Sequence, residues 1–241
     1  MDGDGAGQRA QGTGRATTDR PRSEAGGRSA DLDKRVAAEG AAGLVESGMT
    51  VGLGTGSTVA YLLPALARRG LDITCVATSP ATFDAARRLG LDVRPFTGVD
   101  RLDLAIDGAD QVDPDGWLVK GGGGAHTREK VVAAAAERYV VIVSSDKLVD
   151  ALVAPVPLEL LAFGVDATLR LLGDARLVER PASPDGGVLA EYVGAIGDPA
   201  DVAEQLSATP GVVEHGLFPP VMVDDVFVGR AGQLDCRRLG R

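Results

Sequence analysis

The sequence predicts an α/β protein built on a doubly wound, mostly parallel sheet, with a small α+β domain inserted near its end. Two observations support this fold class. Between residues 31 and 153, short apolar segments alternate with segments of helical periodicity, as in a sheet covered by helices. Between residues 154 and 220, the expected order becomes strand, helix, strand, strand, helix, strand. We therefore expect a Rossmann-like domain over 31–153 plus 221–241 and a ferredoxin-like small domain over 154–220.

The N-terminal segment, residues 1–30, is rich in Gly, Arg, Ser and Ala and has almost no large apolar side chain. Because it cannot bury a core, we predict a disordered tail. A helix is expected from Asp31 to near Gly48. The first domain should then contain helices at 58–69, at 81–89 and after Thr127, and strands at 50–53, 73–77, 92–96, 102–106 and 139–144.

The small domain should contain four short strands, at 155–160, 176–180, 188–193 and 211–215, and helices at 165–172 and 199–207. The turn Ser-Pro-Asp-Gly-Gly at 183–187 separates the two middle strands. After the small domain, the apolar residues 226–228 are expected to return as a strand to the first sheet.

Composition excludes several classes of protein. The formal net charge is −9, whereas nonspecific binding of nucleic acid needs a basic face, so no nucleic-acid partner is expected. No apolar run reaches the roughly 18 residues of a membrane span. The N-terminus shows no secretory signal, and the two cysteines, Cys75 and Cys236, have no metal-ligand spacing. We expect a cytoplasmic protein with no membrane partner, no disulfide framework and no zinc site.

Residues 52–58, Gly-Leu-Gly-Thr-Gly-Ser-Thr, follow a predicted strand and open a predicted helix. Glycines permit a tight turn, and N–H groups at a helix N-terminus attract phosphate. The spacing matches neither a dinucleotide fingerprint nor a P-loop. The segment therefore indicates an anion-binding turn, with an ordinary capped strand-to-helix turn as the alternative.

Two further segments place charged side chains near strand ends. Asp107-Gly108-Ala109-Asp110 ends the strand at 102–106, at the sheet edge where α/β proteins bind ligands. Two carboxylates there are candidates for handling sugar hydroxyls, although a solvated Asp-Gly turn is equally frequent. After the strand at 139–144 comes Ser145-Asp146-Lys147, and only four of the 25 basic residues are lysine.

The most informative segment is 120–130, Lys-Gly-Gly-Gly-Gly-Ala-His-Thr-Arg-Glu-Lys. Four consecutive glycines cost backbone entropy, and close approach of a ligand to the backbone would justify that cost. Lys120 and Glu129 flank them with a cation and a carboxylate. A flexible loop with charged flanks is the alternative. His126 and His215 are the only histidines. The sequence therefore has few residues for histidine-based nucleophilic catalysis or for a histidine metal site.

In this order and spacing, the segments at 54–58, 107–110, 120–130 and 145–147 resemble the ribose-5-phosphate isomerase type A family. The resemblance implies an aldose–ketose isomerase that acts on a small sugar phosphate without metal or cofactor, and that forms dimers or tetramers. It implies that Glu129 is the general base, and that Asp107, Asp110 and Lys120 open the sugar ring and polarise its oxygens. The implied substrate-binding residues are Thr55, Gly56, Ser57, Thr58, Gly108, Ala109, Gly121, Gly122, Gly123, Lys147 and Lys34.

The sequence departs from the family pattern at two places. Gln111 stands where the family often has Glu, which removes a charge close to the expected site, and the turn within 180–192 differs from the family's. Two other functions stay open. A non-catalytic sugar-phosphate sensor would need an attached DNA-binding module, for which residues 1–30 are too polar and Gly-rich. A CoA transferase would use a glutamate as nucleophile, and the chain length and lysine pattern do not favour it.

Overall fold

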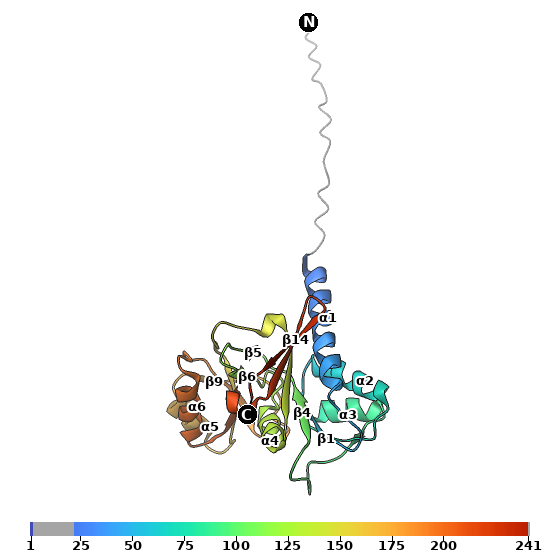
Figure 1. Cartoon of the computed structure of the whole chain (residues 1–241). Coiled ribbons are helices and arrows are strands. Elements are labelled where there is room, and N and C mark those ends of the chain that lie inside the picture. Colours follow the sequence, from blue (N-terminus) through green and yellow to red (C-terminus); the bar gives the residue numbers. More distant parts are fainter. Residues whose placement is uncertain (2–21, 241) are drawn as a thin grey trace.

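The structure is a computed structural model that describes residue 1 and residues 22–240 (Figure 1). It contains a seven-stranded sheet, a four-stranded sheet and a three-stranded sheet. Within the described residues, no helix is both long enough and apolar enough to cross a membrane.

The first helix is longer at its start, and shorter at its end, than the sequence indicated. α1 spans Arg22–Ala42, so it begins nine residues before Asp31 and ends before Ser47. The predicted tail of 1–30 is therefore wrong for residues 22–30, while 2–21 lie outside the described residues. Once the packed part of a helix has formed, each added residue extends it without the cost of a new nucleus. At the other end, Gly43 stops the helix before a turn.

The seven-stranded sheet has the order β14-β13-β7-β4-β1-β2-β3. All neighbours are parallel except β13 and β14. Counted along the chain without β14, the strands follow the order 3-2-1-4-5-6 of a Rossmann-like fold. The strands are β1 (Thr50–Leu53), β2 (Thr74–Ala77), β3 (Asp92–Val93), β4 (Leu104–Asp107), β7 (Tyr139–Ser144), β13 (Asp225–Arg230) and β14 (Gln233–Arg238).

Helices cover both faces of this sheet, as the doubly wound prediction requires. One face packs against α1, α2 (Val59–Arg69) and α3 (Pro80–Arg88) in a core that includes Leu53, Leu62 and Ile142. The other face packs against α4 (His126–Ala135) and the three-stranded sheet, through Val132, Val141 and Phe218 among others. All six residues of β7 are buried, because both of their faces are covered.

The four-stranded sheet has the order β11-β8-β10-β9, with every neighbouring pair antiparallel. Two helices connect its strands, and the chain order confirms the ferredoxin-like prediction. The elements are β8 (Val156–Leu160), α5 (Val165–Leu172), β9 (Ala175–Leu177), β10 (Val188–Tyr192), α6 (Pro199–Ala208) and β11 (Val212–His215). In Figure 1 this part lies on the opposite side of the seven-stranded sheet from α2 and α3.

The three-stranded sheet was not predicted, because two-residue strands carry no readable periodicity. It consists of β5 (Gln111–Val112), β6 (Leu118–Val119) and β12 (Leu217–Phe218), in the order β12-β6-β5. β12 comes directly after the four-stranded sheet, and Leu217 shares a core with Val119 and Leu158. Because β12 belongs to the three-stranded sheet and Leu217 packs in the core of the four-stranded sheet, the domain limits at 154 and 220 stay a prediction. Two 3₁₀ turns complete the fold, η1 (Ser145–Lys147) and η2 (Pro220–Met222).

Two predicted strands end three residues early in the structure. β3 ends at Val93, and β9 ends at Leu177 rather than near Arg180. Pro95 lies two residues beyond β3 and Pro181 four residues beyond β9, and a proline has no N–H for the ladder of a sheet, so neither strand continues past its proline.

Candidate active site

The candidate site lies where the strand order reverses, at the carboxyl ends of the adjacent strands β1 and β4. Asp107 ends β4, and its Oδ1 accepts hydrogen bonds from the backbone N–H groups of Gly108 (2.7 Å) and Thr55 (3.0 Å). A Cβ atom on Gly54 would lie 1.8 Å from that same oxygen. Only glycine therefore lets the turn after β1 approach the Asp107 carboxylate so closely.

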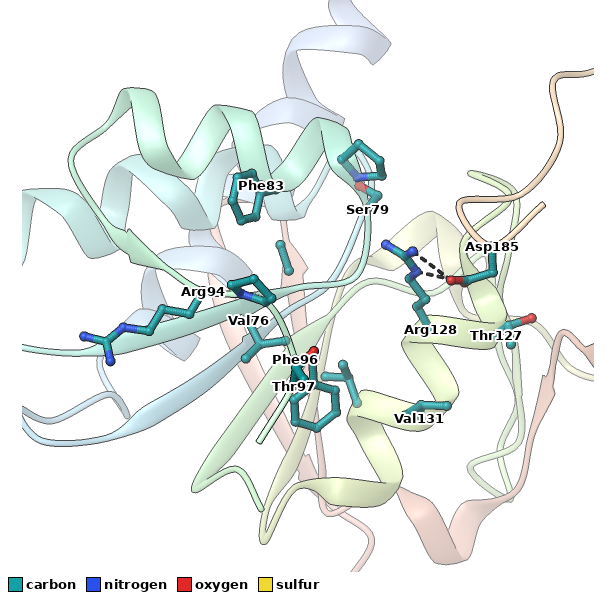
Figure 2. A pocket seen from close by; sticks show the side chains of 14 residues that line it. Val76, Ser79, Phe83, Arg94, Phe96, Thr97, Thr127, Arg128, Val131 and Asp185 are labelled. Atoms are coloured by element: carbon teal, nitrogen blue, oxygen red, sulfur yellow. Dashed lines mark hydrogen bonds and ion pairs between the residues drawn. The ribbon is translucent and has the colours of Figure 1, made fainter. Parts of the chain in front are cut away.

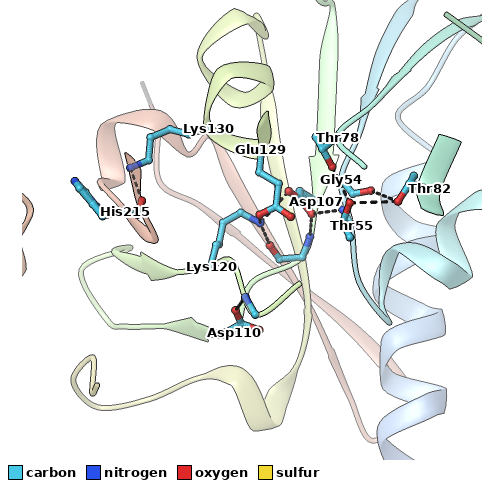
Figure 3. A network of polar contacts seen from close by, with 12 residues as sticks. Gly54, Thr55, Thr78, Thr82, Asp107, Asp110, Lys120, Glu129, Lys130 and His215 are labelled. Atoms are coloured by element: carbon cyan, nitrogen blue, oxygen red, sulfur yellow. Dashed lines mark hydrogen bonds and ion pairs between the residues drawn. The ribbon is translucent and has the colours of Figure 1, made fainter. Parts of the chain in front are cut away.

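Lys120 joins two carboxylates at the centre of the site (Figure 3). Its Nζ lies 2.8 Å from Asp107 Oδ2 and 3.2 Å from Glu129 Oε2, and it also donates to the carbonyl oxygen of Gly108. Each of the three charged side chains is at most 3% exposed. A buried ammonium is stable only when such partners compensate its lost hydration.

Three different elements bring these groups together. Lys120 directly follows β6, and its N–H donates to the carbonyl oxygen of Gly216 at 2.8 Å. Glu129 lies in the first turn of α4, and Asp107 ends β4. The site therefore depends on the three-stranded sheet, which holds the lysine in place.

Burial controls the proton equilibria of this cluster. Burial, and then repulsion from Asp107, raises the pKa of Glu129 to about 8, although Lys120 counteracts the shift. Burial also raises the pKa of Asp107, against the pull of Lys120. For Lys120, burial disfavours the charge, but the two carboxylates outweigh it and hold the pKa well above its usual range. A carboxyl group with a pKa near neutrality suits proton transfer.

A pocket opens over Lys120 and Glu129. All of its lining residues are ones that the sequence singled out, namely Thr55, Gly56, Ser57, Thr58, Gly108, Ala109, Asp110, Lys120, Gly121, Gly122, Gly123, Glu129 and Lys147. Asp107 lies behind Lys120 rather than on the pocket wall. The Asp110 carboxylate accepts a hydrogen bond from Gly122 N–H at 2.9 Å, which connects the two predicted loops.

Three other residues that the sequence analysis named have places of their own in the structure. Lys34 does not line this pocket; it lies on α1, with Nζ 4.0 Å from Asp31. His126 is fully buried beneath Gly121 instead of facing the pocket, and burial lowers its pKa to about 4. Gln111 hydrogen-bonds both the N–H and the carbonyl oxygen of Val153, each at 2.8 Å. A glutamate could not donate to that carbonyl oxygen, which gives the amide at this position a structural reason.

Sequence reasoning missed a group of hydroxyls beside the pocket. Thr55 Oγ1 lies 2.8 Å from Thr78 Oγ1, and Thr82 donates to the carbonyl oxygen of Gly54 at 3.0 Å. Thr78 directly follows β2, so its place at a strand end was the signal that could have identified it. These bonds fix the turn after β1 from the neighbouring strand.

A larger pocket, of about 720 Å³, lies between α3 and α4 (Figure 2). Phe83, Phe96 and Val131 make much of its wall apolar, and Arg128 is paired there with Asp185. None of Asp107, Lys120 and Glu129 lines it. We therefore assign the chemistry to the smaller, polar pocket.

Comparison with known proteins identifies the family of the chain. The family model for ribose 5-phosphate isomerase A (phosphoriboisomerase A) matches residues 74–233. The ribose-5-phosphate isomerase A of Methanosarcina acetivorans is 43% identical over 212 residues, which cover 82% of this chain and 90% of that protein. The protein of the same name from Caulobacter vibrioides is 44% identical, over 83% and 95%.

The chain belongs to the ribose-5-phosphate isomerase A family. Solved structures of family members share its fold. The Neisseria gonorrhoeae enzyme superposes with a TM-score of 0.82 at 31% identity, over 88% of this chain and 98% of that one. The Methanocaldococcus jannaschii enzyme gives 0.80 at 32% identity, over 86% and 98%. A third isomerase, solved in complex with phospho-erythronic acid, gives 0.80 at 34% identity, over 85% and 97%.

Proposed function

We propose that this protein interconverts D-ribose 5-phosphate and D-ribulose 5-phosphate, an aldose–ketose isomerisation in the non-oxidative branch of the pentose phosphate pathway. The single observation that carries the proposal is the buried Lys120 ammonium between Asp107 and Glu129, at the base of the polar pocket. The names of the relatives agree with it, as does the phospho-erythronic acid bound to one of them.

Glu129 is the proposed general base. The isomerisation removes a proton next to a carbonyl group and passes through an enediolate, so a base must move a proton between C1 and C2. A positioned carboxylate contributes roughly 10²–10⁴-fold to such a transfer. Glu129 lines the pocket while its carboxylate contacts Lys120, as this role requires.

Lys120 and the glycine loop are the proposed oxyanion donors. The enediolate develops negative charge on the oxygens of C1 and C2, and preorganised donors stabilise that charge most in a site shielded from water. The Lys120 ammonium already lies at the pocket floor, and Gly121, Gly122 and Gly123 bring backbone atoms to its wall. Asp110, which is exposed at the rim, is placed to exchange the proton of the ring hydroxyl when the sugar opens.

The turn after β1 is the proposed phosphate site. Thr55, Gly56, Ser57 and Thr58 line the pocket just before α2, whose N-terminus favours an anion. Lys147 lines the pocket as well and adds a partly exposed ammonium. Binding the phosphate there would hold the reacting carbons over Glu129, so that binding energy supports the chemical step.

The pH dependence of turnover should reveal the raised pKa of Glu129. Only the ionised carboxylate accepts a proton, so kcat/KM for ribose 5-phosphate should rise with pH to a midpoint of about 8. The folded pKa lies above the unfolded value of about 4.3, so Glu129 should also destabilise the fold increasingly between those two pH values. A pH–rate profile tests this expectation, and a midpoint near pH 4 would contradict it.

The decisive experiment measures conversion of ribose 5-phosphate to ribulose 5-phosphate by the purified chain, with EDTA present. Turnover would support the reaction and its independence of added metal together. If the parent chain binds ribose 5-phosphate without converting it, the sensor function replaces the proposal. If it does neither, the pocket serves another ligand.

We also propose a cytoplasmic location and a dimeric or tetrameric assembly. Both cysteines are unpaired, as in a reducing compartment. Phe163, Leu161 and Leu171 of the small domain are all more than half exposed, and exposed apolar side chains often mark a contact surface. Light scattering of the purified chain measures the assembly directly.

A further inference from the structure

Glu159, on β8, is a buried carboxylate outside the pocket, and it connects two segments distant in sequence. It is 2% exposed. Its Oε2 accepts a hydrogen bond from the Thr127 hydroxyl, and its Oε1 accepts one from Ser183 Oγ at 2.5 Å. Because a buried carboxylate is costly unless it is satisfied, these two bonds are a strong constraint on both segments.

The turn at 183–187 is shaped around this carboxylate. Ser183 Oγ accepts hydrogen bonds from the N–H groups of Gly187 (3.0 Å) and Asp185 (3.2 Å), so its own proton is directed to Glu159. A Cβ atom on Gly187 would lie 2.2 Å from Glu159 Oε1, so the turn needs a glycine there. The stretch that departs from the family pattern therefore still supplies a defined partner for Glu159.

The other partner, Thr127, lies in the first turn of α4, two residues before Glu129. The residue before this helix, Ala125, has no side chain that can cap it. Glu129 N–H donates to the carbonyl oxygen of Ala125 at 2.9 Å, so Thr127 and Glu129 belong to the same turn. A bond that fixes Thr127 consequently fixes the backbone that carries Glu129.

We propose that Glu159 is a positioning residue for the isomerisation: through Thr127 it sets the first turn of α4 and holds the Glu129 carboxylate at its place beside Lys120. The inference rests on the proposed function. A second link joins the same segments, since Arg128 Nη2 lies 2.7 Å from Asp185 Oδ1 (Figure 2). This pair is bidentate, because Arg128 Nε also donates to Asp185 Oδ2 at 2.8 Å. Both side chains are more than a third exposed, however, so water screens the pair more than it screens the buried hydrogen bonds of Glu159.

The test compares Thr127→Val with Thr127→Ser and with Asp185→Asn. Valine keeps the shape of threonine and removes only the hydroxyl that reaches Glu159. A base misplaced by about 1 Å can lose up to 100-fold in rate, so we expect kcat to fall about 10-fold. KM should change less than about twofold, because the phosphate and hydroxyl contacts stay. Thr127→Ser and Asp185→Asn should both keep the parent's kcat.

Hydrogen exchange of the Glu129 amide gives a second readout that does not need activity. The amide should exchange faster in Thr127→Val than in the parent, and at the parent's rate in Asp185→Asn. An unchanged kcat and unchanged exchange in Thr127→Val would overturn the inference, as would an equal loss in Asp185→Asn. If the parent shows no turnover, the proposed function fails, and the exchange rates alone decide whether Glu159 positions the helix. Should Thr127→Val not fold, Thr127→Ala, which also removes the hydroxyl, replaces it with the same expectations.

Discussion

Replacing Glu129 by Gln should lower kcat for ribose 5-phosphate by roughly 10²–10⁴-fold, the usual contribution of a positioned acid–base group. Glutamine has nearly the same shape but cannot accept the proton from carbon. The protein should stay folded, because the variant removes a carboxyl group that is destabilised by burial. Turnover, measured beside far-ultraviolet circular dichroism and thermal unfolding, checks both parts.

Glu137→Gln is the matched control. Glu137 follows α4, but its side chain is 48% exposed and pairs with Arg101 on the surface. The substitution should leave kcat and KM at the parent's values. Glu129 would not be the base if Glu129→Gln retained turnover within tenfold of the parent, and Asp107 or Asp110 would then be the residue to replace.

Replacing Lys120 by Met should impair both activity and stability. The variant leaves two buried carboxyl groups without their cation, and breaking a buried ion pair typically costs roughly 3–5 kcal/mol. It also removes the proposed oxyanion donor, a change that lowers kcat by about 10²–10³-fold in other enzymes. Urea unfolding and turnover measure the two effects separately.

The loss of stability in Lys120→Met should depend on pH. Without the ammonium, nothing opposes the effect of burial on Asp107 and Glu129, so both folded pKa values should rise still further above their unfolded values of about 4 than in the parent. Stability should therefore fall as pH rises above about 4, and the variant should be weaker at pH 8 than at pH 5. Equal destabilisation at both values would contradict a cluster held together by charge.

Lys147→Met, at the partly exposed pocket lysine, should raise KM and leave stability unchanged.

The sequence was informative where the site follows from strand ends. Asp107 ends the apolar strand β4 and Thr55 lies two residues after β1, and parallel strands place their carboxyl ends at one edge. The glycines at 121–124 indicated close approach to the backbone, and three of them, Gly121, Gly122 and Gly123, line the pocket. Because these signals are local, the sequence was sufficient to predict where the site lies, whereas the roles of its residues came from the family resemblance.

Contacts between distant segments were not predictable in this way. In the sequence, Glu159 is one charged residue in a predicted strand. Only the folded chain shows that the hydroxyls of Thr127 and Ser183 both donate to its carboxylate. Lys34 had the residue type of a phosphate ligand, but helical periodicity does not determine which pocket a side chain reaches. β14 was not predicted, because all six of its residues are exposed and its sequence does not alternate between apolar and polar side chains.

The exposed strand β14 has a consequence for behaviour at high concentration. It is antiparallel to β13 and carries Asp235, Arg237 and Arg238, so charged side chains lie along one edge of the seven-stranded sheet. At the other edge, β3 is only two residues long and Pro95 follows it. Free edges that are long, flat and apolar invite strands from other molecules, whereas short or charged edges resist them. Both ends of this sheet thus protect the folded chain against aggregation through strand addition.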